Sequence, residues 1–193
     1  HWLGIISFIP LNLVLEKLNA KNYLSHWKQG ILYFSICWLT GAIASTIGGY
    51  WITNSIHVFG HLPLLLSFLI TGFGYGLEVG FQLFVYFGIP LLFIRKQNNW
   101  DLPVRFLFVL ALEPWYPKLI QWNYGGLTFS GIPFIEQLAD LIGSSGLIIY
   151  NVGLTFLVIG WLRLRNKKYS NFNHIYKVTL AYIFLWFFGV IYG

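Results

Sequence analysis

Residues 48–63, GGYWITNSIHVFGHLP, join two strongly apolar runs of the chain and contain no Lys, Arg, Asp or Glu. The stretch is instead rich in aromatic and weakly polar side chains, and Gly60 and Pro63 lie at its end. Aromatic rings with one polar edge favour the boundary between hydrocarbon and water. We therefore expect residues 48–63 to form the turn where the chain leaves a bilayer and enters it again.

The composition on both sides of this stretch indicates an integral membrane protein. Of the 193 residues, 57% are hydrophobic, 20% are aromatic and only 9% are charged, and the mean hydropathy is +0.66. Soluble domains of ordinary composition carry about 25% charged residues. Several apolar runs also reach the roughly 20 residues that cross about 30 Å of hydrocarbon as a helix.

Six apolar runs predict an all-α integral membrane fold, a bundle of about six transmembrane helices with a partly irregular periplasmic segment. The third run is longer than a perpendicular span requires, so we expect that helix to tilt, kink or protrude. Glycines and Pro133 between residues 122 and 140 argue against a continuous helix there. The predicted spans, forming one transmembrane domain over residues 1–193, are 2–15, 30–52, 62–94, 102–120, 141–162 and 175–192.

Basic loops and loops without a basic excess alternate along the chain. The loops after the first, third and fifth runs are rich in Lys and Arg, whereas the loop after the second run has no formal charge. Because Lys and Arg concentrate in cytoplasmic loops, this alternation predicts that residues 53–61, residues 118–140 and the C-terminal end are periplasmic. The net charge of +6 then indicates anionic membrane headgroups, and no nucleic acid, as the partner.

Glu78 lies inside the third apolar run, in residues 72–84, GFGYGLEVGFQLF. An ionisable group in a span is costly and faces protein, water or a partner, so Glu78 is a functional candidate. Alternatively, Glu78 and Gln82 share one helical face and hydrogen-bond to a neighbouring helix. Four glycines here fit close helix packing better than a phosphate loop: Gly72, Gly74, Gly76 and Gly80.

Glu113 lies in residues 110–118, LALEPWYPK, near the predicted periplasmic end of the fourth run. Its carboxylate can orient a cationic headgroup or an amine substrate. It can equally pair with Lys118 or cap the helix that the prolines interrupt. The residues alone favour none of these roles.

His57 and His61 are four residues apart, a spacing that on a helix places both side chains on one face and can bind a metal. The intervening Phe59 and Gly60, and the lack of a carboxylate or cysteine nearby in sequence, favour interfacial histidines instead. We therefore expect no metal site in this stretch.

No group of residues in the sequence supports hydrolysis or group transfer by itself. The sequence lacks G-x-S-x-G and H-E-x-x-H, and its single cysteine, Cys37, lies in an apolar run as a small hydrophobe would. We expect no catalytic residue and no cofactor in this chain. The start at His1 and the absence of methionine lead us to expect a piece of a longer protein.

Three short patterns, in this order, resemble the membrane part of apolipoprotein N-acyltransferases. The resemblance extends from residue 3 to about residue 162. The chain departs from the family pattern after Glu113, where Pro114 and Trp115 follow and no Arg appears. The matching residues are Trp51, Ser55, Phe59, Gly60 and Pro63, then Gly131 and Pro133, then 137–143 with Gly146 and Asn151.

The resemblance implies an enzyme of the bacterial inner (cytoplasmic) membrane that moves an acyl chain from a phospholipid to the α-amino group of the diacylglyceryl-cysteine of an apolipoprotein. It implies that a periplasmic nitrilase-like domain outside this chain carries a Glu, Lys and Cys triad and a thioester intermediate. This chain would anchor that domain in the membrane and form the path for both lipid substrates. The residues expected at the periplasmic mouth of that path are Trp51, His57, Phe59, His61, Glu113 and Trp115.

Two other classes of protein stay open on the sequence alone. One is a small helical transporter or channel subunit that uses Glu78 as a coupling group, although the inverted repeats that would favour it are not visible in the sequence. The other is a non-catalytic membrane scaffold, which the absence of a triad favours.

Overall fold

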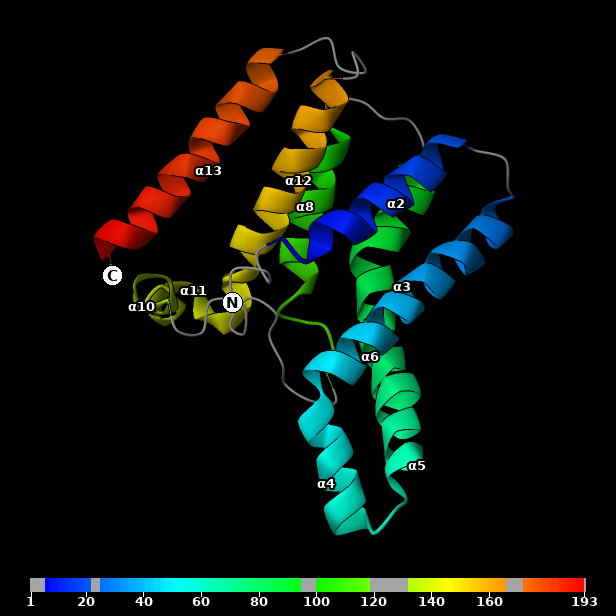
Figure 1. Ribbon diagram of the computed structural model, residues 1–193. Coiled ribbons are helices and arrows are strands. Elements are labelled where there is room, and N and C mark those ends of the chain that lie inside the picture. The colour runs from blue at the N-terminus through cyan, green and yellow to red at the C-terminus, as the bar shows by residue number, and fades with distance from the viewer. Residues whose placement is uncertain (1–5, 22–24, 95–99, 119–131, 166–171, 193) are drawn as a thin grey trace. The chain divides into compact units, whose positions relative to one another are not determined.

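The computed structural model describes residues 6–21, 25–94, 100–118, 132–165 and 172–192, and these form helices and turns with no strand among them (Figure 1). The predicted all-α membrane fold is confirmed. Three helices are long and apolar enough to cross a membrane: His26–Gly48, Leu64–Phe93 and Ile148–Arg165. The number of six spans stays a prediction.

The chain divides into two compact units, one of residues Leu18–Phe93 and one of His1–Lys17 with Ile94–Gly193. In the first unit, α3 (His26–Gly48) lies antiparallel to one continuous helix over Leu64–Phe93 (Figure 1). The single transmembrane domain over residues 1–193 stays a prediction. The segments of the long helix are α5 (Leu64–Leu69), η1 (Ile70–Tyr75), α6 (Gly76–Leu83), η2 (Phe84–Gly88) and α7 (Ile89–Phe93).

The length of the third run is confirmed. The helix Leu64–Phe93 has 30 residues, which at 1.5 Å per residue gives about 45 Å, against about 30 Å of hydrocarbon. Two of its segments, η1 and η2, are π-helical. In such segments the backbone hydrogen bonds join residues five apart, so each turn of the helix is locally wider.

Glycines bring α3 and α6 into close contact, as predicted for Gly76 and Gly80. A Cβ built on Gly80 would lie 2.4 Å from Trp38 Cα, and one built on Gly76 would lie 2.6 Å from Ala42 Cα. Gly41 of α3 faces the same contact, because its built Cβ would lie 2.4 Å from the Gly80 backbone nitrogen. The two backbones therefore touch at a distance that any larger residue would prevent.

The turn predicted over residues 48–63 is shorter than expected. Residues Tyr50–Gly60 form a helix, α4, and the chain reverses at residues 61–63. His61 takes a left-handed conformation with φ 52°, and His57 Nδ1 lies 2.6 Å from the Leu62 carbonyl oxygen. Aromatic and aliphatic residues are compatible with helix, so only the glycine pair before Tyr50 and the segment after Gly60 interrupt it.

The described residues of the second unit form six helical segments, and α8 and α12 pack together, as do α12 and α13. The ring of Tyr150 on α12 packs edge-on against that of Trp186 on α13 at 5.1 Å between centroids. The segments are α2 (Phe8–Lys21), which continues into the first unit, α8 (Asp101–Leu112), α10 (Pro133–Glu136), α11 (Ala139–Gly146), α12 (Ile148–Arg165) and α13 (Phe172–Tyr192).

Four predicted spans differ from these helices. The second, 30–52, crosses the glycine pair at residues 48 and 49, where α3 ends and α4 begins. The first helix continues past residue 15 to Lys21, because the polar residues after Leu15 are themselves buried in part. The fourth ends at Leu112, just before Pro114. The span 141–162 is divided, since Gly143 has φ 71° inside α11 and α12 begins only at Ile148. Of the segment predicted to be irregular, residues 119–131 lie outside the described part.

Candidate functional site

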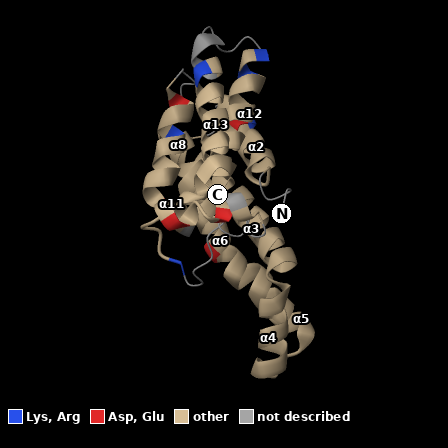
Figure 2. Cartoon of the chain, turned by 90° about the vertical axis from the view of Figure 1, so that its left-hand side faces the viewer, with Lys and Arg blue, Asp and Glu red and all other residues tan. Residues whose placement is uncertain are grey.

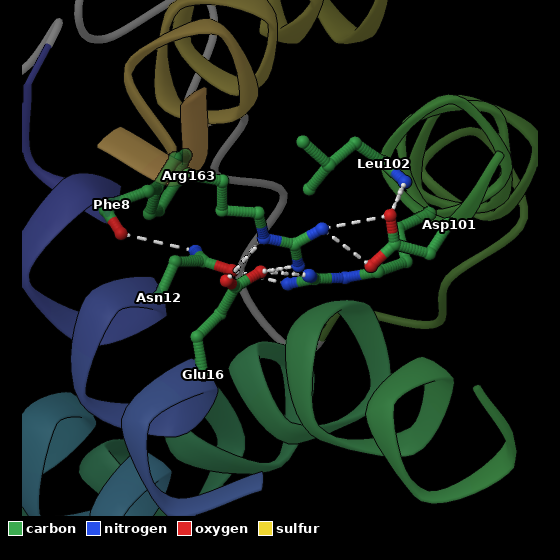
Figure 3. A network of polar contacts seen from close by, with 7 residues as sticks. Phe8, Asn12, Glu16, Asp101, Leu102 and Arg163 are labelled. Atoms are coloured by element: carbon green, nitrogen blue, oxygen red, sulfur yellow. Dashed lines mark hydrogen bonds and ion pairs between the residues drawn. The ribbon is translucent and has the colours of Figure 1, made fainter. Parts of the chain in front are cut away.

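A buried network of charged residues joins three helices of the second unit (Figure 3). Glu16 comes from α2, Asp101 and Arg105 come from the first turns of α8, and Arg163 comes from the last turn of α12. Between 0 and 7% of each residue is exposed. The sequence suggested only that these residues belong to three basic loops.

Arg163 lies between the two acids. Its Nε donates to Glu16 Oε2 at 2.9 Å and its Nη2 donates to Glu16 Oε1 at 2.6 Å. Its Nη1 donates to both carboxylate oxygens of Asp101, at 2.8 and 2.7 Å. This planar, two-sided pairing is available to a guanidinium and not to an ammonium group.

Arg105 completes the network from α8. Its Nη1 donates to Glu16 Oε1 at 2.5 Å and its Nη2 donates to Asn12 Oδ1 at 3.0 Å. Its guanidinium carbon lies 4.9 Å from the centre of the Phe156 ring. The Arg105 side chain is therefore held on one side by polar groups and on the other by an aromatic face.

Two cations and two anions balance within this network, so it does not present a free charge to an anionic lipid or a metal. Burying four charges is costly, and only mutual pairing with good geometry offsets that cost. The arrangement therefore joins the middle of α2 to the start of α8 and the end of α12, and it is a structural site.

The sequence contained a partial signal for this network. Asn12 and Glu16 are four residues apart, as are Asp101 and Arg105, which places each pair on one helical face. Glu16 is also the only acid in a segment with three lysines. Nothing in the spacing shows that Arg163, more than fifty residues further along the chain, pairs with both acids.

Four of the residues predicted at a lipid entrance lie on α4 or in the turn that follows it, in the first unit. Trp51 and Phe59 on α4 are 44 and 81% exposed, and His57 and His61 are exposed as well. Figure 2 shows the hairpin of α4 and α5 without a Lys, Arg, Asp or Glu. These apolar and aromatic side chains are suited to contact with lipid.

The other two predicted entrance residues, Glu113 and Trp115, belong to the second unit. Trp115 is 84% exposed, whereas Glu113 is 2% exposed and its Oε1 accepts a hydrogen bond from Lys118 Nζ at 2.5 Å. Of the alternatives for Glu113, the ion pair with Lys118 is thus present. The shared entrance that would unite the residues of both units stays a prediction.

In the described part of the chain, no group of three or more His, Cys, Asp or Glu side chains lies close enough to bind a metal. His61 follows α4 in a left-handed turn, so it does not continue the helical face of His57.

Glu78 lies half-buried in the first turn of α6. Gln82, one turn later, donates from its Nε2 to the hydroxyl of Tyr86 on the same long helix at 2.9 Å. The coupling role considered for Glu78 stays a prediction.

Comparisons with known proteins agree on one family. The family model for the apolipoprotein N-acyltransferase N-terminal domain matches residues 1–159. An apolipoprotein N-acyltransferase from Bdellovibrio bacteriovorus is 27% identical over 198 residues, covering 94% of this chain and 32% of that protein. The chain thus spans about a third of the length of this curated relative. No solved structure matches the chain.

Proposed function

Because the chain belongs to the family of the apolipoprotein N-acyltransferase N-terminal domain, we propose that it is the membrane part of a lipoprotein N-acyltransferase. The parent protein would transfer an acyl chain from a phospholipid to the α-amino group of the diacylglyceryl-cysteine of an apolipoprotein. The observation that carries the proposal is the family match over residues 1–159, in a chain with three helices able to cross a membrane.

In this proposal the chain anchors the catalytic domain and supplies no catalytic group. The described charged residues support this division of labour, because Glu16, Asp101, Arg105 and Arg163 are paired with one another and Glu113 is paired with Lys118. The catalytic Glu, Lys and Cys, with the thioester on the Cys, would lie in the nitrilase-like part of the parent protein.

The orientation proposed from the loop charges places the chain in the bacterial inner membrane with residues 53–61 and 118–140 in the periplasm. The network of Glu16, Asp101, Arg105 and Arg163 supports it, since these residues come from the three loops assigned to the cytoplasm. Residues that share one buried ion network lie on one side of a membrane.

The lipid path would begin along α4. Its exposed aromatic residues, Trp51 and Phe59, lie beside two weakly polar histidines and far from any formal charge in the sequence. Such a surface can admit acyl chains while the histidines contact headgroups at the interface. The prediction also includes the exposed Trp115 and Glu113, whose carboxylate pairs with Lys118.

The proposal is tested by measuring acyl transfer to a diacylglyceryl peptide by the full-length protein in phospholipid vesicles. We expect transfer by the unmodified protein and a loss when the catalytic Cys of its soluble part is replaced. An unmodified, folded protein that transfers no acyl chain from any phospholipid class would overturn the enzymatic assignment and favour the scaffold.

A further inference from the structure

The hairpin of the first unit is polar inside and apolar outside near its tip. The buried residues of α4, α5 and η1 are Thr53, Ser67, Thr71 and Gly72, and the last buried residue of α3 is Ser45. Large exposed side chains such as Phe59 and Leu65 cover the outer face. Small and hydroxyl-bearing residues commonly pack transmembrane helices together, so this distribution alone implies no ligand.

Ser45 and Thr53 behave differently from the other hydroxyl residues of this unit. Five of those hydroxyls donate to the carbonyl oxygen four residues earlier: Ser35, Thr40, Thr46, Ser67 and Thr71. Ser45 and Thr53 are only 3 and 5% exposed, yet neither hydroxyl has a hydrogen-bonding atom within reach in the described residues. Both hydroxyls are therefore buried in the packed interface without a partner among the described residues.

The backbone is irregular between these two residues. The glycine pair at residues 48 and 49 separates α3 from α4, and the Thr53 nitrogen lies 3.4 Å from the Gly49 carbonyl oxygen, near the limit of a hydrogen bond. Across the interface runs the π segment η1, where a Cβ built on Gly72 would lie 2.8 Å from Thr46 Oγ1. Irregular helix of this kind is commonly accompanied by inserted water.

We propose that internal water binds on both sides of the joint between α3 and α4, to the hydroxyl of Ser45 before the joint and to that of Thr53 after it. Water both donates and accepts, as a hydroxyl does, and it is retained where buried polar groups lack protein partners. A lipid headgroup does not fit, because both oxygens are sealed from the surface. An ion lacks a counter-charge, since residues 29–77 contain no Lys, Arg, Asp or Glu. The proposal is independent of the acyltransferase assignment.

Two substitutions of Thr53 separate bound water from an unpaired hydroxyl. Thr53→Val keeps the shape and removes the hydroxyl, whereas Thr53→Ser keeps the hydroxyl and removes a methyl group. If water is bound, Thr53→Val of the full chain in detergent lowers the melting temperature by roughly 2 to 4 °C, and more than Thr53→Ser does. If the hydroxyl is unpaired, the order of the two variants is reversed, which would overturn the proposal.

Thr71→Val is the matched control, because Thr71 is equally buried but its hydroxyl donates to the Ser67 carbonyl oxygen. We expect Thr71→Val to change the melting temperature less than Thr53→Val does. A second measurement needs no variant. In the full chain with labelled threonine methyl groups, NMR should show a cross-peak between water and the Thr53 methyl protons and none at Thr71, and its absence at Thr53 would contradict the proposal.

Discussion

The two units of the molecule hold their helices together by opposite means. In the first, α3 and α6 approach until the backbone near Gly41 touches that near Gly80. In the second, α2, α8 and α12 are joined by Glu16, Asp101 and two arginines, all buried. Close packing needs only small side chains, whereas the ionic contact needs every member in place.

The comparison teaches that the two contacts should fail differently. Removing one charge leaves its partners buried and unpaired, and no small movement of the chain corrects this. Enlarging one glycine instead pushes two helices apart by a limited distance, after which the remaining contacts persist. One substitution in the ionic network should therefore lower the free energy of unfolding more than one substitution at the glycine contact.

The largest effect is expected from removing Glu16, because it is the acid that both arginines share. Glu16→Leu leaves two buried guanidinium groups against Asp101 alone and should lower the free energy of unfolding by about 3 to 5 kcal/mol. Denaturant titration of the purified chain in detergent measures this change.

Two further variants serve as controls for that experiment. Lys17→Gln alters the exposed neighbour and should change the free energy of unfolding by less than about 0.5 kcal/mol. The double variant Glu16→Leu with Arg163→Met removes one charge of each sign, so it should lose less than Glu16→Leu alone. A double variant that loses the sum of both single effects would show that the residues do not act as one network.

The second largest effect is expected at the glycine contact. Gly80→Leu places a side chain where even a Cβ would lie 2.4 Å from Trp38 Cα, so the two helices must separate. We expect a loss of about 1 to 3 kcal/mol in the free energy of unfolding. The control is Gly74→Ala, because a Cβ there meets nothing within 4 Å and alanine favours helix by about 1 kcal/mol over glycine. Equal losses in the free energy of unfolding for Gly74→Ala and Gly80→Leu would show that the contact between α3 and α6 does not explain the effect.

This difference also separates what sequence could predict from what it could not. Glycines spaced four apart on an apolar helix indicate close packing directly, so the roles of Gly76 and Gly80 were predicted. The ion pair of Glu113 with Lys118 was one of several alternatives, because five residues of sequence separation place the two groups within reach of each other. The pairing of Arg163 with Glu16 depends on how three distant helices meet, and local spacing contains no such information.

The helix boundaries also divide into those that the sequence predicted and those that it did not. Proline ended α8 near the place where the sequence indicated a break. The helix α4 was missed because residues rich in aromatic rings suit an interfacial turn and a helix equally well. The break before α12 rests on the positive φ of Gly143, which a glycine permits but does not require.

A smaller effect is expected at Glu113, whose carboxylate pairs with Lys118. Glu113→Gln should lower the free energy of unfolding by about 1 to 2 kcal/mol, since Lys118 can turn toward water. The exchange variant Glu113→Lys with Lys118→Glu distinguishes two roles. If the ion pair alone matters, the exchange restores acyl transfer by the full-length protein. If the carboxylate contacts a substrate, the exchange restores stability but leaves acyl transfer low.

The smallest effect on stability is expected at the exposed rings. Phe59 is 81% exposed and buries little against the protein, so Phe59→Ala should change the free energy of unfolding by less than about 0.5 kcal/mol. If α4 is part of the lipid path, the same variant of the full-length protein should raise the KM for phospholipid severalfold while kcat stays unchanged, because access changes and chemistry does not. Leu65→Ala is the matched control, since Leu65 is 72% exposed on α5 and was not assigned to the entrance. If both variants raise the KM for phospholipid equally, the effect belongs to the apolar surface in general and not to a specific entrance. If only Phe59→Ala raises it, the lipid contacts the face of α4.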